Sequence, residues 1–269
     1  MPVTDRQVER WLRVDLGHHD VTNQVPGETT GRLVGKEAGV VAGLDAAVAV
    51  FEYLRVETEQ FVDDGDRIEA GQAALRVEGS AREVLRGERV AVNITGHASG
   101  IATRTRKAVD AARDICEDVR IAGTRKTTPG LRGIEKRAIV AGGGDTHRLD
   151  LSHMVMVKDN HIAELGLVEA VEHFRERVSF ATRIEVEVER PEDGERAADA
   201  GADIVLFDNL SPETIERGVE RLPEETIAEA SGGITVETVP EYAATGVDVI
   251  SMGSLTHSAP SLDYSFRMG

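Results

Sequence analysis

The sequence predicts an α/β protein, an incomplete parallel α/β barrel of about six or seven strands with a smaller α+β domain at its N-terminus. In the second half of the chain, short β-prone runs alternate with helical segments, which indicates βα units and a parallel sheet. From Arg183 onward these runs begin about 20 to 24 residues apart, close to the length of one βα unit. The 269 residues, of which 41% are hydrophobic, suffice for one barrel and an accessory domain.

The N-terminal part reads as one helix followed by a small sheet. Thr4 to Gln7 has the form of a capping box and predicts a first helix that runs to about Leu16. Residues 31–79 contain short apolar runs separated by Gly and Asp, with an Ala-rich helical stretch around residues 42–54. The acidic run at residues 63–66 lacks the ligand spacing of a calcium loop, so we interpret it as a solvated turn.

A long helix is expected from Glu88 to Arg113, where it links the two domains. Gly96 and Gly100 weaken this helix but allow another backbone to approach it closely. We place the N-terminal domain at residues 1–105 and the catalytic barrel at residues 106–253. The last segment, residues 254–269, is expected to return to the N-terminal domain.

The barrel domain offers fewer strands than the eight of a complete barrel. Six are expected: Val119–Ala122, Met154–Val157, Arg183–Val188, Asp203–Phe207, Ile227–Glu229 and Val247–Met252.

Charge and composition exclude several classes of function. The chain carries 48 acidic against 31 basic residues, a net charge of -17, so a nucleic acid would be repelled. No apolar stretch approaches the roughly 20 residues that span a bilayer, and we expect a cytoplasmic protein without a membrane partner. Because the acids are spread over the chain and lysine is scarce, adaptation to high salt is a hypothesis. The single cysteine, Cys116, is expected to be a buried apolar side chain.

Polar residues follow the expected strands at the ends where parallel barrels gather their reacting groups. Lys126 and Lys158 are two of only five lysines, and a Ser-Gly-Gly sequence offers backbone N–H groups that suit a phosphate. The strand ends carry Thr124–Thr128, Lys158–His161, Glu187, Asp208–Asn209, Ser231–Gly233 and Gly253–Ser254. The pattern favours a catalytic site over solvated surface charge.

Several strings, in order along most of the chain, resemble the quinolinate phosphoribosyltransferase family of type II phosphoribosyltransferases. They are Gly123–Arg132, His147–Arg148, Met156–His161, Glu185–Glu187, Leu206–Asn209, Glu229–Ile234 and Ile250–Gly253. The resemblance implies an enzyme, a pentosyltransferase of NAD biosynthesis. Its substrates would be quinolinate and phosphoribosyl pyrophosphate, and its products nicotinate mononucleotide, pyrophosphate and carbon dioxide. It also implies Mg²⁺ as the cofactor.

The resemblance implies roles for particular residues. Arg89 matches an arginine that reaches into the active site of a neighbouring subunit, which implies a homo-oligomer, a dimer or a hexamer. Glu187 and Asp208 match the acids that face the ribose and the metal. The quinolinate pocket would be lined by Arg125, Lys126, His147, Arg148 and Lys158, and the ribose phosphate would be bound by Ser231, Gly232, Gly233, Gly253 and Ser254. Thr95 and Gly96 depart from the family, where bulky apolar residues are more usual.

The expected chemistry explains these residue types. Guanidinium groups pair with carboxylates through two N–H donors, and a dicarboxylic acid with a diphosphate needs several cations. Displacement of pyrophosphate builds positive charge on the ribose, which Glu187 or Asp208 would stabilise while Mg²⁺ neutralises the leaving group. Lys126 or Lys158 would stabilise the electron density that remains after decarboxylation.

Three alternatives stay open at this point. A nicotinate phosphoribosyltransferase would need fewer cations in its pocket. A Schiff-base lyase of barrel type would use Lys158 to attack a carbonyl. A binding protein without catalytic activity would retain the barrel alone.

Overall fold

The computed structural model describes residues 2–269. Internal contacts divide the chain into two compact units. Unit 1 contains the residues up to Arg106, the segment Thr128–Gly143 and the C-terminal residues Ser258–Gly269, and unit 2 contains Lys107–Thr127 and Gly144–His257. The domain boundaries at residues 105 and 253 stay a prediction.

Unit 1 contains an antiparallel sheet in the order β12-β1-β5-β3. Its strands are β1 (Glu28–Gly35), β3 (Glu57–Gln60), β5 (Ala73–Ser80) and β12 (Tyr264–Met268), and a separate ribbon pairs β2 (Gly39–Val40) with β4 (Arg67–Ile68). Alternate residues of the sheet, such as Leu33, Leu75 and Val77, are buried in one hydrophobic cluster with helix α2 (Leu44–Tyr53). The last residues of the chain thus complete the sheet that its first strand begins.

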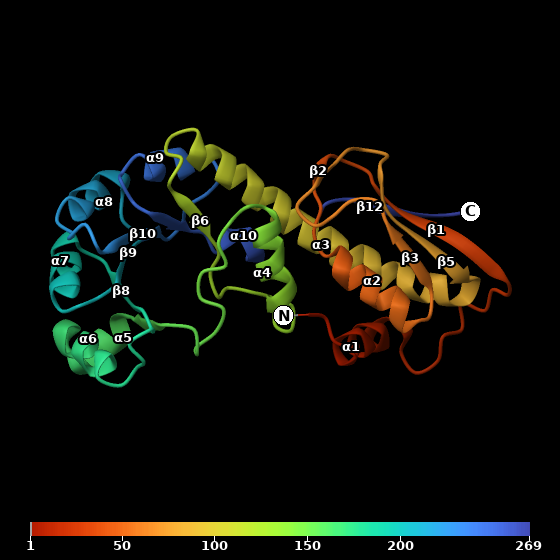
Figure 1. The fold of residues 1–269 in the computed structure, drawn as a ribbon, viewed down its shortest axis with the longest axis horizontal. Helices are drawn as coiled ribbons and strands as arrows, with labels where there is room; N and C mark the ends of the chain where they lie inside the picture. Colours follow the sequence, from red (N-terminus) through yellow and green to blue (C-terminus); the bar gives the residue numbers. More distant parts are fainter. Residues whose placement is uncertain (1) are drawn as a thin grey trace. The chain divides into compact units, whose positions relative to one another are not determined.

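Three further helices pack in unit 1. They are α1 (Asp5–Leu16), the first part of α3 (Ala81–Arg113) and α4 (Arg132–Ala141). The long helix begins at Ala81, not at Glu88, because Ala81 and Val84 already face the core. Figure 1 shows α3 as one continuous helix, and its last residues belong to unit 2.

The expected close approach at two glycines of α3 is confirmed. A Cβ at Gly100 would lie 2.0 Å from the backbone oxygen of Pro260, and one at Gly96 would lie 3.0 Å from that of Leu262. The amide of Leu262 also donates a hydrogen bond of 2.9 Å to the carbonyl of Gly96. The chain before β12 therefore lies directly on the helix backbone.

Unit 2 is built on a six-stranded sheet whose pairs are all parallel, in the order β6-β11-β10-β9-β8-β7. The strands are β6 (Arg120–Ala122), β7 (Val155–Val157), β8 (Ile184–Val188), β9 (Ile204–Asp208), β10 (Ile227–Ser231) and β11 (Val249–Ser251). Each lies within one residue or a few of its expected run, and the α/β class is confirmed. Within the described chain β6 and β7 form the two edges of the sheet, so the barrel is incomplete.

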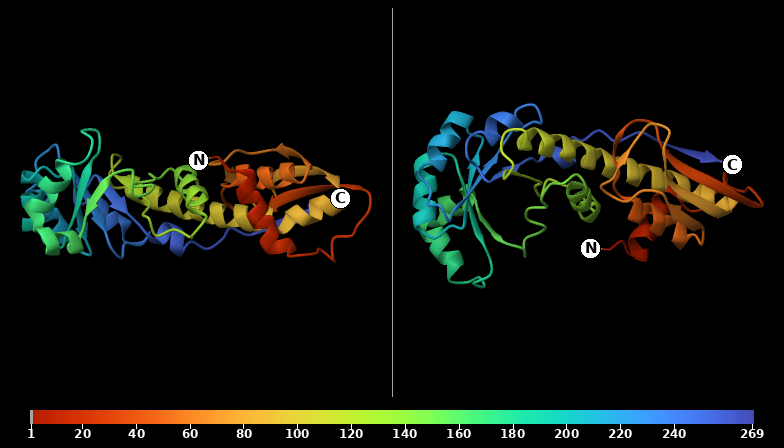
Figure 2. Two further views of the ribbon diagram at one scale, coloured as in Figure 1. Left: turned by 90° about the horizontal axis from the view of Figure 1, so that it is seen from below. Right: turned by 45° about the horizontal axis from the view of Figure 1, so that its top comes forward.

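Helices cover the outer side of this curved sheet, as Figures 1 and 2 show for α6 to α9. The helices of this unit after α3 are α5 (Asp159–Leu165), α6 (Leu167–Arg175), α7 (Pro191–Asp199), α8 (Pro212–Val219), α9 (Val239–Ala243) and α10 (Ser254–His257). The core between helices and strands consists largely of Val, Ile and Ala side chains, with Phe207 fully buried among them. None of the helices formed by residues 2–269 is both long enough and apolar enough to cross a membrane.

Candidate active site

A cleft of about 410 Å³ opens at the carboxyl ends of the parallel strands in unit 2. This is the edge at which parallel α/β sheets bind ligands, because the loops that follow the strands converge there. The cleft is lined by Thr124, Arg125, Lys126, His147, Arg148, Met156, Lys158, Glu187, Leu206, Asp208, Asn209, Glu229, Ser231, Gly232, Gly233 and Ser251.

The cleft brings together all the predicted site residues except Arg89, Gly253 and Ser254. Arg89 lies on α3 in unit 1, where its guanidinium is 3.5 Å from the carboxylate of Glu88 and its side chain is 57% exposed. Ser254 begins α10, and its hydroxyl is buried without a hydrogen-bond partner among residues 2–269.

The loop after β6 presents Arg125 and Lys126. The amide of Lys126 donates to the hydroxyl of Thr124 at 3.1 Å, and its carbonyl accepts a hydrogen bond of 2.6 Å from Thr256. A Cβ at Gly253 would lie 2.9 Å from Cδ of Lys126. Gly253 therefore leaves room for the lysine stem.

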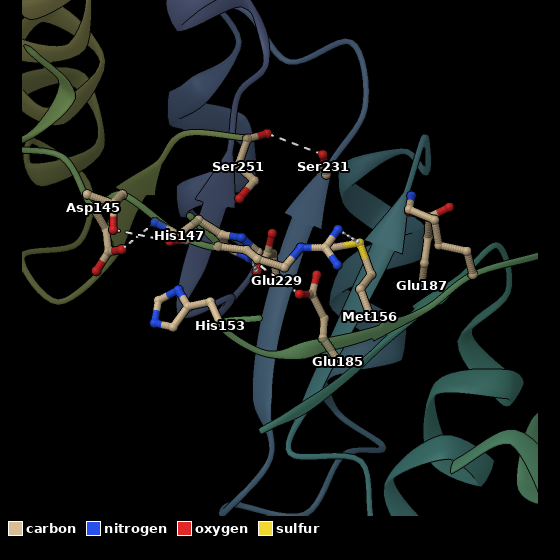
Figure 3. Close-up of polar contacts among 12 residues, drawn as sticks. Asp145, His147, His153, Met156, Glu185, Glu187, Glu229, Ser231 and Ser251 are labelled. Carbon is tan, nitrogen blue, oxygen red and sulfur yellow. Dashed lines mark hydrogen bonds and ion pairs between the residues drawn. The ribbon is translucent and has the colours of Figure 1, made fainter. Parts of the chain in front are cut away.

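His147 reaches from its loop toward two carboxylates on the strands (Figure 3). Its Nε2 lies 3.1 Å from Glu229 on β10 and 3.5 Å from Glu185 on β8. Its backbone has a φ of 50°, an unfavourable region for a side chain with a Cβ, and its amide donates to Asp145 at 2.7 Å. The loop therefore holds this imidazole in place at both its backbone and its ring.

The two carboxyl groups beneath His147 are completely enclosed. Glu185 is 0% and Glu229 is 1% exposed. Burial, together with the neighbouring charge of Glu229, raises the pKa of Glu185 to about 8, although His147, Arg148 and Lys158 oppose this shift. Glu185 therefore holds its proton at neutral pH.

Arg148 is a cation held almost out of water, with an exposed fraction of 6%. Its Nη2 contacts the sulfur of Met156 at 3.1 Å, and its Nε has no hydrogen-bond partner within residues 2–269. Desolvation, followed by repulsion from Arg125, lowers the pKa of the guanidinium, while Glu185 and Glu187 oppose the shift. A guanidinium in this state is ready to bind an anion.

Two carboxylates at strand ends also line the cleft. Glu187 at the end of β8 forms an ion pair with Lys158, whose side chain is 43% exposed. Asp208 at the end of β9 accepts a hydrogen bond of 2.6 Å from the side-chain amide of Asn209. The cleft thus contains both basic and acidic side chains.

The turn after β10 supplies an open stretch of backbone. Gly232 and Gly233 have φ values of 98° and 65°, which favour glycine. A Cβ at Gly232 would lie 2.4 Å from the side-chain oxygen of Asn209, whereas one at Gly233 would meet no described atom within 4 Å. The turn can therefore present its backbone N–H groups to a phosphate.

Two groups of side chains have the chemistry to hold a cation. The ligand atoms of His147, Glu185 and Glu229 all lie within 4.8 Å of one another. Glu187 and Asp208 offer hard oxygen ligands to the cleft itself, where water and a diphosphate would have room. This second pair fits Mg²⁺, which commonly binds one or two carboxylates and completes its shell with water and phosphate oxygens.

Comparison with known proteins agrees with the fold and the cleft. The C-terminal domain of quinolinate phosphoribosyl transferase matches residues 101–267, and the N-terminal domain of that protein matches residues 20–99. The chain belongs to the quinolinate phosphoribosyltransferase family.

Relatives match almost the whole chain. A probable nicotinate-nucleotide pyrophosphorylase (carboxylating) of Methanothermobacter thermautotrophicus is 45% identical, over 97% of this chain and 97% of its own length. The human nicotinate-nucleotide pyrophosphorylase (carboxylating) is 40% identical, over 97% of this chain and 90% of its own. The crystal structure of NadC from Streptococcus pyogenes is 38% identical and covers 100% of this chain and 99% of its own, with a TM-score of 0.93.

Three residues at the site were not predicted from the sequence, and they share one feature. Met156, Glu185 and Glu229 each lie two positions before a predicted site residue, which is on the same strand or directly follows it. Because a strand turns alternate side chains to the same face, a residue two positions back also faces the interior of the barrel. Asn209 was expected at a strand end but without a role, and the structure places it in the cleft beside Asp208 with a φ of 54°.

Proposed function

We propose that this protein transfers a phosphoribosyl group from phosphoribosyl pyrophosphate to quinolinate, with loss of one carboxylate. The products are nicotinate mononucleotide, pyrophosphate and carbon dioxide, in NAD biosynthesis. The observation that carries the proposal is the composition of the cleft, which gathers five basic side chains together with the acids Glu187 and Asp208. Such a set suits a dicarboxylic acid that reacts with a ribose on which positive charge develops.

The basic residues of the cleft bind the acid. Arg148 and Arg125 each have a buried Nε without a hydrogen-bond partner in the described chain, so their guanidinium groups retain donors for a carboxylate. Lys126, His147 and Lys158 complete this set. Recognition of both carboxylates also rejects nicotinate, because a cation left without its anion in a closed site is costly.

The reaction breaks two bonds in turn. The ring nitrogen of quinolinate displaces pyrophosphate from the anomeric carbon, while Glu187 or Asp208 stabilises the positive charge on the ribose. The bond to the 2-carboxylate then breaks, and the electron pair that stays on the ring takes up a proton as carbon dioxide leaves. Lys126 or Lys158 stabilises this electron density. Ser231, Gly232 and Gly233, with the adjoining Gly253 and Ser254, hold the ribose phosphate.

Mg²⁺ belongs to the same proposal. When bound, the ion neutralises the departing pyrophosphate through oxygen ligands. Glu187 and Asp208 would hold it, directly or through water. Glu187 would then exchange its partner Lys158 for the metal, which frees the ammonium for the acid.

Assembly and environment complete the proposal. Arg89 is exposed on α3 in unit 1 and would serve the active site of a neighbouring subunit in a homo-oligomer, a dimer or a hexamer. The net charge of -17 and the scarcity of lysine support adaptation to high salt. A salt titration of thermal stability tests the adaptation, since full stability at low ionic strength would refute it.

One assay tests the activity. Purified protein in high salt is incubated with phosphoribosyl pyrophosphate, Mg²⁺ and either quinolinate or nicotinate, and nicotinate mononucleotide is measured by chromatography. We expect product and carbon dioxide from quinolinate and little from nicotinate. Equal turnover of nicotinate, or none of quinolinate, would refute the proposal.

A further inference from the structure

Two buried carboxyl groups, those of Glu185 and Glu229, lie in the barrel interior at the cleft, which Glu229 helps to line. On β8, Ile184 and Val186 face the hydrophobic core, so Glu185 faces the barrel interior on the same side as Glu187. On β10, Ala228 and Ala230 face the core, so Glu229 faces inward with Ser231. Parallel barrels usually fill their interior layers with bulky branched side chains, chiefly Val, Ile and Leu.

The stability of the fold does not account for these two acids. Neither oxygen of Glu185 and only one oxygen of Glu229 has a hydrogen bond to another of the described residues. Carboxyl groups so enclosed usually cost stability, and apolar residues of similar volume are often neutral or stabilising in their place. A costly group that is retained in a core points to a functional requirement.

Both acids face a single atom of the site, Nε2 of His147. Glu229 is the nearer at 3.1 Å and forms the hydrogen bond, and Glu185 lies behind it at 3.5 Å. The backbone of His147 is fixed separately by Asp145. With its backbone anchored, the direction of the imidazole depends on its two side-chain torsions, and the hydrogen bond to Glu229 restricts both.

We propose that Glu229 is a positioning residue that fixes the orientation of His147, so that the ring meets a carboxylate of the acid substrate. Glu229 accepts a hydrogen bond from Nε2–H, and Nδ1, which also carries a hydrogen in the imidazolium, can donate to the substrate. The arrangement parallels metal sites, in which a carboxylate behind a histidine sets its tautomer and direction. This inference rests on the proposed function.

Glu229→Leu tests the proposal, because it removes the acceptor but retains the volume that a barrel layer favours. We expect the KM for quinolinate to rise by about tenfold or more, since an anchored hydrogen bond to the acid is lost. The KM for phosphoribosyl pyrophosphate should change less than about twofold and kcat less than about threefold. The melting temperature should stay the same or rise. Glu229→Gln keeps an acceptor oxygen and should restore the KM to within about threefold of the original value.

Two further variants make the result specific. Glu135→Gln is a matched control, because Glu135 is also buried (0% exposed) and also binds a histidine Nε2, that of His97 at 2.9 Å, but in unit 1. It should lower stability without a selective rise in the KM for quinolinate. In a His147→Ala background, Glu229→Leu should add less than about twofold to that KM, because its effect passes through His147.

The proposal is overturned if Glu229→Leu leaves the KM for quinolinate within twofold. It is also overturned if Glu229→Leu lowers the melting temperature and raises the KM for both substrates to a similar extent. A third contrary result would be a double variant in which the rise in the KM for quinolinate equals the product of the rises in Glu229→Leu and His147→Ala. Should Glu229→Leu not fold, Glu229→Ala carries the same expectations for the two KM values. The unsubstituted protein tests the proposed function separately, since it either forms nicotinate mononucleotide from quinolinate or does not.

Discussion

Replacement of Arg148 by Met gives a direct test of how the cleft binds an acid. Met has a similar length and stays apolar, so it fills the same buried space without the charge. In the protein alone the guanidinium is 6% exposed, contacts the sulfur of Met156 and leaves its Nε without a partner among residues 2–269. Loss of the charge should therefore leave stability unchanged or raise it.

The loss of activity can be worked out from the hydrogen bonds that the guanidinium would make. Hydrogen bonds to charged groups contribute about 1.5–3 kcal/mol each, so two parallel bonds to a carboxylate contribute at least about 3 kcal/mol. At about 1.4 kcal/mol for each factor of ten, kcat/KM for quinolinate should fall by more than about 100-fold.

Steady-state kinetics with quinolinate varied at saturating phosphoribosyl pyrophosphate measures this loss. The control is Arg196→Met on α7, where the arginine is 57% exposed and pairs with Asp193 at 2.8 Å, away from the residues that line the cleft. Arg196→Met should leave kcat and the KM for quinolinate unchanged. A kcat/KM within about fivefold of the original in Arg148→Met, or a melting temperature lowered by the loss of this cation, would refute the reasoning.

Three further predictions concern stability in unit 1. Gly100→Ala should lower the free energy of unfolding by about 2 kcal/mol or more, because overpacking against the Pro260 carbonyl outweighs the gain of about 1 kcal/mol in helix propensity. Gly96→Ala, where the nearest atom is 3.0 Å away, should change the free energy of unfolding by less than about 1 kcal/mol. Equal losses of stability in the two variants, measured by denaturant unfolding, would contradict this. Asp64→Ala should cost about 1 kcal/mol, since the amides of Gly43 and Leu44 donate to this carboxylate at the start of α2; an unchanged denaturation midpoint would contradict a capping role. For Glu135, burial favours the neutral form, but hydrogen bonds from His97 and Thr128 hold the pKa of the carboxyl below its ordinary value of 4.5. The stability difference between the original protein and Glu135→Gln should therefore be complete above pH 4.5 and vanish as the pH falls through the folded pKa. A difference that persists or grows in acid would argue against that ion pair.

The strands of the barrel domain could be predicted because their sequence signal is local. Runs such as Ile204–Phe207 are short, apolar and spaced by one βα unit, and all six expected strands form the sheet of unit 2. The start of α3 could not be placed as well, because Ala81 and Val84 owe their helical state to the core that they face, which is a tertiary effect. The return of the chain along Gly96 and Gly100 was visible only as glycine in a helix, and the structure supplies the partner, residues 260–262.

In the candidate active site, too, some residues could be predicted from local sequence and others depend on the tertiary structure. Residues just after a strand, such as Lys158 and Asp208, were predicted because topology alone brings strand ends together. Glu185 and Glu229 could not be recognised as a pair, since their strands are separated by β9 in the sheet and no spacing in the sequence records that both approach His147. Their burial was equally hidden, because charged residues are usually exposed and a single sequence gives no reason to place these two in the core.

Two of the basic residues of the cleft are already paired with acids of the protein itself, and this has a consequence for selectivity. Lys158 is paired with Glu187, and His147 faces Glu229, so a weakly charged ligand gains little by replacing those partners. Arg148 keeps an Nε without a partner among the described residues, and its burial makes a carboxylate there strongly favourable. A ligand with one carboxylate can satisfy Arg148 but leaves the other cations with their own acids. A dicarboxylic acid can bind Arg148 with one carboxylate and compete with Glu187 for Lys158 with the other. The internal ion pairs therefore weaken the binding of a monocarboxylic acid more than that of a dicarboxylic acid.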